Sequence, residues 1–132
     1  EYIPGALNAP SKVYPDALAK NPVLVQTEAV ADMGTFVLAD ANVPITAHHI
    51  PTNHAADMLI VQVGPSNSAV VFNSDLLNAG PNLFIPPPFI PNGTSLYNAL
   101  IQKNLNGPNV VLAAGHGAGT NTFNELKTAL GL

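Results

Sequence analysis

All four histidines of the chain lie next to runs of apolar, β-branched residues that predict strands. They are His48, His49, His54 and His116. An aspartate, Asp75, follows another such run at residues 69–72. Histidine and carboxylate side chains at strand ends are typical of a transition-metal site, because a rigid strand holds each ligand in place. The pattern therefore predicts that the chain contributes at least part of a metal centre.

The histidines before the predicted strand at 58–63 also have simpler interpretations. His54 lies in a loop mouth where a metal is accessible, but a surface loop histidine, or one that hydrogen-bonds Asp57, fits the same spacing. His48 and His49 are adjacent, so in an extended segment they face opposite sides and only one of them could join a given site. For this pair the pattern favours one packed and one exposed side chain.

Asp75 and His116 are the two candidates that follow predicted strands. Asp75 could ligate or bridge metals, although aspartate is equally common as a turn or helix-capping residue. His116 lies between two glycines, which allow the backbone to approach closely or to take positive φ. This setting favours a functional histidine, and the lysine and spacing of a phosphate-binding P-loop are missing. The chain has no cysteine and no Gly-x-Ser-x-Gly motif, so nothing supports a thiol or serine nucleophile.

The elements that must position these residues alternate between strands and helices. Residues 58–63 and 69–72 are the strongest strand candidates, and the turn-forming segment between them predicts an antiparallel hairpin. Further strands are predicted at 23–27, 35–38, 43–49 and 109–114. The proline-rich stretch 82–92 predicts an ordered surface loop. Two helices follow from apolar residues at helical spacing, one beginning at Thr94 or Ser95 and one spanning 122–130.

Composition limits what kind of protein this is. Of the 132 residues 47% are hydrophobic and 9% charged, and the net charge is −4 with lysine as the sole basic residue. Without a basic cluster there is no electrostatic surface for nucleic acid. No apolar run is long enough to span a bilayer. The low charge leans towards an exported protein, and Asn92 of Asn92-Gly93-Thr94 is a glycosylation candidate.

We expect one α/β domain over residues 23–132, preceded by a proline-rich arm over residues 1–22 with at most one short helix near 15–20. The arm has four prolines, yet its apolar side chains predict that it is ordered and packed onto its own domain or a neighbouring chain. Because the sequence begins with Glu1, a preceding segment is also expected.

In their order along the chain, the motif residues resemble the C-terminal half of the metallo-β-lactamase superfamily. His54 with Asp57 matches the His-Thr/Ala-x-x-Asp turn of that family. Asp75 matches its strand-Gly-Asp turn, with Ser74 in place of the glycine, and His116 matches its Gly-His-Gly. The resemblance covers roughly residues 23–132. It implies half of an αββα sandwich, with a mixed sheet of about five strands and helices packed on one face.

The resemblance also implies roles for individual residues. His54, Asp75 and His116 would be metal ligands, with one or two zinc ions in the intact site and Asp75 bridging them. Asp75 and His116 would be the catalytic residues, with Asp75 orienting a metal-activated water that attacks an ester, thioester, amide or phosphoester. The substrate-binding candidates are Phe84, Pro87 and Phe89.

One part of the family pattern is missing, because the N-terminal signature His-x-His-x-Asp-His is absent. The chain alone is therefore expected to be inactive, with zinc binding by this chain alone left open. Its expected partner is an N-terminal half or another copy of the chain, in an oligomer. The alternative function is a non-catalytic, exported structural or assembly module derived from the same fold.

Overall fold

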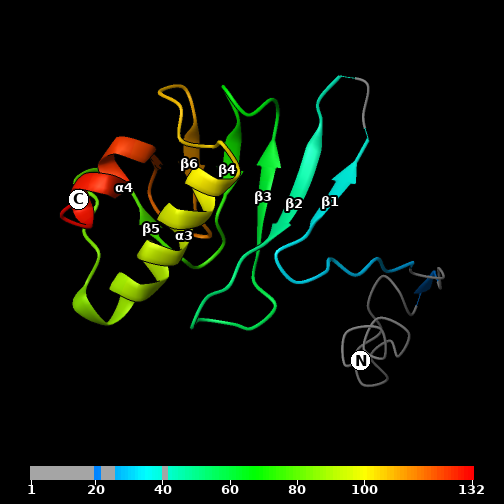
Figure 1. Ribbon diagram of the computed structural model, residues 1–132, viewed down its shortest axis with the longest axis horizontal. Helices are drawn as coiled ribbons and strands as arrows, with labels where there is room; N and C mark the ends of the chain where they lie inside the picture. Colours follow the sequence, from blue (N-terminus) through cyan, green and yellow to red (C-terminus); the bar gives the residue numbers. More distant parts are fainter. Residues whose placement is uncertain (1–19, 22–25, 40–41) are drawn as a thin grey trace.

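The computed structural model describes residues 20–21, 26–39 and 42–132 and has a mixed α/β fold (Figure 1). Its main sheet has six strands in the order β1-β2-β3-β4-β6-β8. They are β1 (Thr35–Leu38), β2 (Ile45–His49), β3 (Leu59–Val63), β4 (Val70–Phe72), β6 (Val111–Ala113) and β8 (Thr120–Thr122). Neighbouring strands are antiparallel except β4 and β6, which run parallel. Two short strands, β5 (Asn78–Ala79) and β7 (His116–Gly117), form a separate parallel pair.

Helices pack against this sheet and close the hydrophobic core (Figure 1). They are α3 (Ile90–Gln102), α4 (Phe123–Ala129) and the short 3-10 helix η1 (Pro87–Phe89) that leads into α3. The register pairs Val71 with Leu112 on the sheet, and both are fully buried. They share one core with Leu96 of α3 and Leu126 of α4. The helices therefore bury one face of the sheet.

Much of the predicted secondary structure is confirmed. β3 and β4 form the antiparallel hairpin expected from the turn between them, and β1, β2 and β6 lie within the strands predicted at 35–38, 43–49 and 109–114. The last helix begins where its capping residue predicts. Thr122 accepts from the Glu125 N–H at 3.2 Å, and the Glu125 carboxylate accepts from the Thr122 N–H in return. This capping box satisfies two donors that a helix start otherwise leaves unpaired.

The predicted start of the preceding helix is wrong. α3 begins at Ile90, and η1 occupies residues 87–89, so the surface loop expected over 82–92 ends earlier. Pro91 is accommodated because it lies in the first turn of α3, where a backbone N–H has no helical partner to lose. Asn92 is consequently inside a helix and 7% exposed. The folded chain does not present Asn92 as a glycosylation acceptor, because a glycan needs an exposed side chain.

Other expectations fall on the edge of the described structure or outside it. The arm at 1–22 and the strand at 23–27 lie mainly outside the described residues. The main sheet has six strands where about five were expected. Among the described residues no helix is long and apolar enough to cross a membrane.

The face of the sheet away from the helices is apolar and open. The register aligns one row across the sheet, and another row runs beside it. The first row is Phe36, Ala47, Val61, Phe72, Ala113 and Thr120, and the second is Leu38, Ile45, Val63, Val70, Val111 and Thr122. Phe36, Leu38, Val70 and Phe72 are 38%, 54%, 43% and 42% exposed. We call this surface the open face.

His48 and His49 are both buried, so the expectation that one of them is exposed is wrong. His49 accepts from the Met33 N–H through Nδ1 and contacts the Ala56 carbonyl through Nε2, both at 3.0 Å. His48 Nε2 lies 3.0 Å from Gln62 Oε1. Both nitrogens of the His49 ring are therefore occupied by contacts with neighbouring segments, and the His48 ring is held by Gln62 of β3 through Nε2.

Burial favours the neutral form of His48. The Gln62 amide nitrogen donates to the Gly64 carbonyl at 2.8 Å, which leaves Oε1 to accept from His48 Nε2. His48 Nδ1 is buried and has no hydrogen-bond partner among the described residues. Loss of solvation lowers the pKa of His48 below its ordinary value of 6.5, and the Lys103 charge lowers it further, against the bond to Gln62.

We therefore expect the free energy of unfolding to decrease as the pH is lowered from 6.5. In that window the unfolded chain takes up a proton on His48 that the folded chain resists, so the unfolded state is favoured by at most about 1.4 kcal/mol per pH unit. Urea denaturation at a series of pH values measures the effect. His48→Gln, which cannot titrate, should flatten the curve, and an equally steep curve in that variant would contradict the assignment.

Candidate functional site

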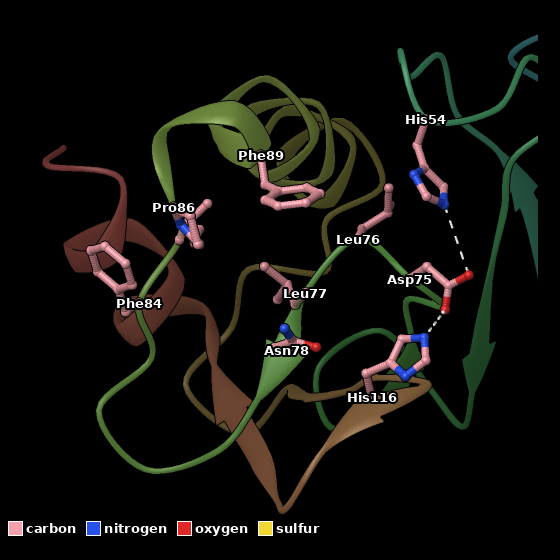
Figure 2. Close-up of a pocket in the computed structure, with 10 residues that line it drawn as sticks. His54, Asp75, Leu76, Leu77, Asn78, Phe84, Pro86, Phe89 and His116 are labelled. Atoms are coloured by element: carbon pink, nitrogen blue, oxygen red, sulfur yellow. Dashed lines mark ion pairs between the residues drawn. The ribbon is translucent and has the colours of Figure 1, made fainter.

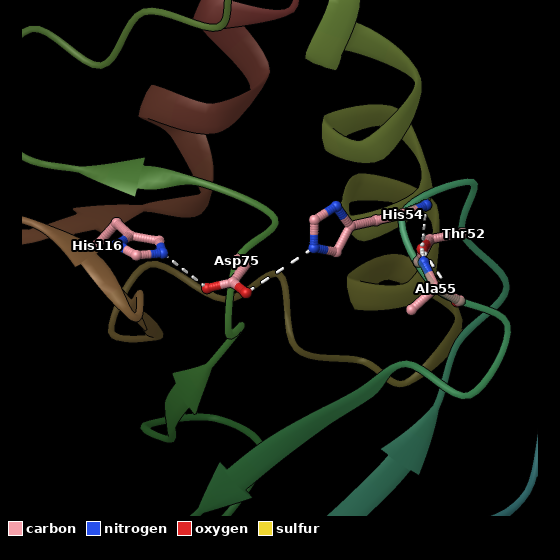
Figure 3. Close-up of polar contacts among 5 residues, drawn as sticks. All are labelled: Thr52, His54, Ala55, Asp75 and His116. Carbon is pink, nitrogen blue, oxygen red and sulfur yellow. Dashed lines mark hydrogen bonds and ion pairs between the residues drawn. The ribbon is translucent and has the colours of Figure 1, made fainter.

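Three predicted ligands meet beside the end of the main sheet (Figure 3). His54 lies in the loop between β2 and β3, Asp75 in the turn after β4, and His116 in β7. His116 Nε2 is 3.1 Å from Asp75 Oδ1, and His54 Nε2 is 3.8 Å from Asp75 Oδ2. The two histidines therefore approach different oxygens of one carboxylate. We call these three residues the His–Asp–His cluster.

The cluster is open to solvent. The side chains of His54, Asp75 and His116 are 37%, 46% and 67% exposed. Among the described residues, the His54 ring pairs with Asp75 and not with Asp57, while its exposure is that of a histidine in a surface loop. Exposure at this level leaves room for a small ligand to reach each histidine nitrogen.

A local turn holds the loop that carries His54. The Thr52 hydroxyl oxygen accepts from the His54 N–H at 3.0 Å and from the Ala55 N–H at 3.3 Å (Figure 3). Threonine side chains commonly replace backbone groups in such turns. Thr52 therefore fixes the backbone from which the His54 ring extends towards Asp75.

The turn that carries Asp75 is tied to the end of β6. The backbone N–H and the side-chain amide of Asn73 both donate to the Ala113 carbonyl, each at 2.8 Å. The Gly115 N–H donates to the Ser74 carbonyl at 2.7 Å. Asn73 is fully buried and was not predicted as a site residue. Its place between a predicted strand and the candidate ligand Asp75 is the signal that could have identified it.

Glycines on both sides of His116 allow this close approach. A Cβ on Gly115 would lie 3.2 Å from Asp75 Oδ1, which is tighter than ordinary contact. Gly117 has φ +103, and a Cβ there would overlap the Ala79 carbonyl of β5. Because β7 pairs with β5 through this contact, Gly117 determines where the His116 backbone lies.

The donor set fits two pairs of metal ligands that share Asp75. Two ligands of a tetrahedral zinc lie about 3.4 Å apart, because each is about 2.0–2.2 Å from the metal. The observed nitrogen-to-oxygen distances of 3.1 and 3.8 Å lie on either side of that value. No group of three or more histidines, cysteines, aspartates or glutamates in the described part of the chain is arranged to hold one ion. The described residues thus provide no complete shell for one ion, and the two histidine–aspartate pairs have a spacing compatible with either ion pairs or pairs of metal ligands.

A cavity of about 280 Å³ adjoins the cluster (Figure 2). It is lined by His54, Asp75, Leu76, Leu77, Asn78, Phe84, Ile85, Pro86, Phe89 and His116. Two of the three predicted substrate-binding residues, Phe84 and Phe89, line it. Pro87, the first residue of η1, is exposed and is not among the residues that line the cavity. Pro86 lines the cavity in its place.

Replacing Gly117 with alanine should destabilise the fold by more than about 2 kcal/mol, because both the positive φ and the Ala79 carbonyl exclude a side chain. Gly119→Ala is the matched control, since its Cβ would meet Gly80 Cα at an ordinary 3.5 Å. Chemical denaturation of both variants measures the difference. Equal stabilities would show that β7 can move away from β5 without cost.

Ser74→Gly should stabilise the chain by up to about 1 kcal/mol, because Ser74 has φ +54, a left-handed conformation that disfavours residues with a Cβ. Ser74→Val should have the opposite effect, since branching at Cβ makes the conformation more costly. Thermal unfolding of the two variants tests the sign. A lower melting temperature for Ser74→Gly would contradict the strain assigned to this turn.

Neither protein-family models, nor curated proteins, nor solved structures gave a match when compared with this chain. The function of the His–Asp–His cluster is therefore inferred from its geometry and from the motif residues that compose it.

Proposed function

We propose that the chain is the C-terminal segment of a zinc-dependent hydrolase of the metallo-β-lactamase fold. The observation that supports this most directly is the bridging position of Asp75, whose two carboxylate oxygens face His54 and His116 separately. A bridging aspartate between one histidine from an upstream loop and one from a Gly-His-Gly is the arrangement that the resemblance implies. In this proposal His54, Asp75 and His116 would hold one or two zinc ions together with ligands from another segment.

Zinc, when bound, would supply Lewis acidity and lower the pKa of a water ligand towards neutrality. The residues of this chain would hold the zinc and orient the attacking water. Each histidine presents Nε2 towards Asp75, which is the nitrogen that would ligate once its proton is lost. Because each histidine must lose this proton before it can bind zinc, zinc binding would be weaker at low pH. The Asp75 carboxylate, fixed through Asn73 and the adjoining turn, would accept a hydrogen bond from the attacking water and orient it.

The open face supports the proposal that the fold is half of a sandwich. Two sheets that pack face to face bury apolar side chains between them, whereas an isolated sheet exposes them to water. Phe36 and Phe72 are among the exposed side chains here, and both lie in the first row of the open face. We propose that a second sheet, from an N-terminal half, covers this surface in the active protein.

A non-catalytic module derived from the same fold is the competing proposal. It is favoured by one observation, that the described residues include no group of three or more ligand-type side chains arranged around a single ion. In such a protein the two histidines would serve Asp75 as hydrogen-bond donors and hold three loops together without metal. Measurement of zinc binding separates the two proposals.

Zinc titration of the purified chain, followed by calorimetry and by the visible spectrum of the cobalt-substituted form, tests the hydrolase proposal. We expect binding at the cluster, weakened at least about tenfold by Asp75→Asn, because that change removes the ligand shared by both pairs. Asp57→Asn is the matched control, since Asp57 is an exposed aspartate in the same loop as His54. Zinc affinity that is the same in wild type and Asp75→Asn would favour the non-catalytic module.

A further inference from the structure

We propose that the cavity beside the His–Asp–His cluster binds the apolar group of a neutral carboxylic ester, and that phosphoesters and other anions are excluded from it in the metal-free chain. The reaction at the ester rests on the hydrolase proposal above. The binding of the apolar group does not, because the cavity is formed by residues that need no metal.

The walls of the cavity away from the cluster are apolar. Leu76 and Leu77 follow Asp75 directly and line the cavity, Phe89 lies near both leucines, and Phe84 lies further from the cluster (Figure 2). Both leucines are nearly fully buried. At about 280 Å³ the space suits a group of the size of a phenyl ring or a short alkyl chain.

Two aromatic rings are left in water at this cavity. Phe84 is 72% exposed and Phe89 is 51% exposed, whereas their neighbour Ile85 is 6% exposed and belongs to the core. Exposed aromatic side chains around a concave surface are typical of binding sites, because a ligand that covers them removes apolar area from water. An apolar group that covers Phe84 and Phe89 would therefore gain binding free energy from the removal of this apolar area from water.

The wall is also rigid. Phe89 ends η1, and its backbone N–H donates to the Pro86 carbonyl at 2.8 Å. The run Pro86-Pro87-Pro88 fixes three consecutive φ angles before Phe89. Ile85 anchors the other side of this segment in the core. Little ordering is therefore needed when a ligand binds, which favours affinity from a small contact area.

Charge excludes anions from the same cavity. Its polar lining consists of His54, Asp75, Asn78 and His116, and no lysine lines it. The chain contains no arginine, and Lys103 is turned elsewhere, donating to the Met33 carbonyl at 3.2 Å. Phosphate and carboxylate groups are normally recognised by arginine, lysine or clustered backbone N–H groups. Without metal, the one formal charge in this lining is that of Asp75, which repels an anion.

The position of the cavity relative to the cluster matches an ester. Leu76 and Leu77 are the next residues after Asp75, so a carbonyl carbon near the carboxylate has its apolar substituent against these leucines and Phe89. A phosphoester in the same position would bring its charged oxygens close to the Asp75 carboxylate. In the metal-free chain the two esters are therefore discriminated by charge.

Phenyl acetate and phenyl phosphate are a matched pair of probes, since they share the aromatic ring and differ in charge. Both are titrated into the isotope-labelled full chain in the presence of a chelator, and binding is followed by NMR shifts of the cavity residues. We expect phenyl acetate to shift Leu77, Phe84 and Phe89 with millimolar affinity, and phenyl phosphate to leave them unchanged. Phe89→Ala should weaken phenyl acetate binding about tenfold.

Phe36→Ala is the matched control, because Phe36 is a comparably exposed phenylalanine on the open face of the sheet. Its affinity for phenyl acetate should equal that of the wild type. Equal or tighter binding of phenyl phosphate, no shift at the cavity residues with phenyl acetate, or equal loss in Phe36→Ala would each overturn the proposal. If zinc binds the cluster but phenyl acetate does not bind the cavity, this inference fails alone. If phenyl acetate binds but zinc does not, the hydrolase proposal fails and the apolar site stands.

Discussion

The parallel pairing of β4 with β6 is the constraint on which the His–Asp–His cluster depends. Its register sets Phe72 beside Ala113, and Asp75 and His116 each follow three residues later. Because both strands run in the same direction, the segments that follow them leave the sheet at the same end. The two side chains meet there. Asn73 reinforces this by donating twice to the Ala113 carbonyl, so the two exits are held together before either side chain takes part in chemistry.

The sequence predicted the parts of this arrangement that depend on local patterns. Alternating apolar runs and the turn at 64–68 identified the β3–β4 hairpin, and the placement of His54, Asp75 and His116 after or before strands identified the residues that meet. Residue spacing along the chain carries this information because strand ends and turns are short-range features.

What could not be predicted depends on contacts between distant segments. His48 and His49 are both buried because they bond to Gln62, Met33 and Ala56. The alternation of side chains along a strand does not reveal such partners. The start of α3 was misplaced because a proline is read as a helix breaker, whereas Pro91 occupies a first-turn position where it is tolerated. Asn73 was missed because its hydrogen-bond acceptor, the Ala113 carbonyl, lies 40 positions away along the chain.

The Gly-His-Gly run contains one residue that the fold requires, Gly117, and one that the proposed chemistry requires, His116. The Ala79 carbonyl excludes any side chain at Gly117, so selection for a folded chain alone preserves that glycine. His116 makes no such demand on the backbone, and its side chain is 67% exposed. A descendant that had lost its chemistry would therefore keep the glycine and be free to lose the histidine. Among related chains, His116 and not Gly117 would record whether the proposed activity survives.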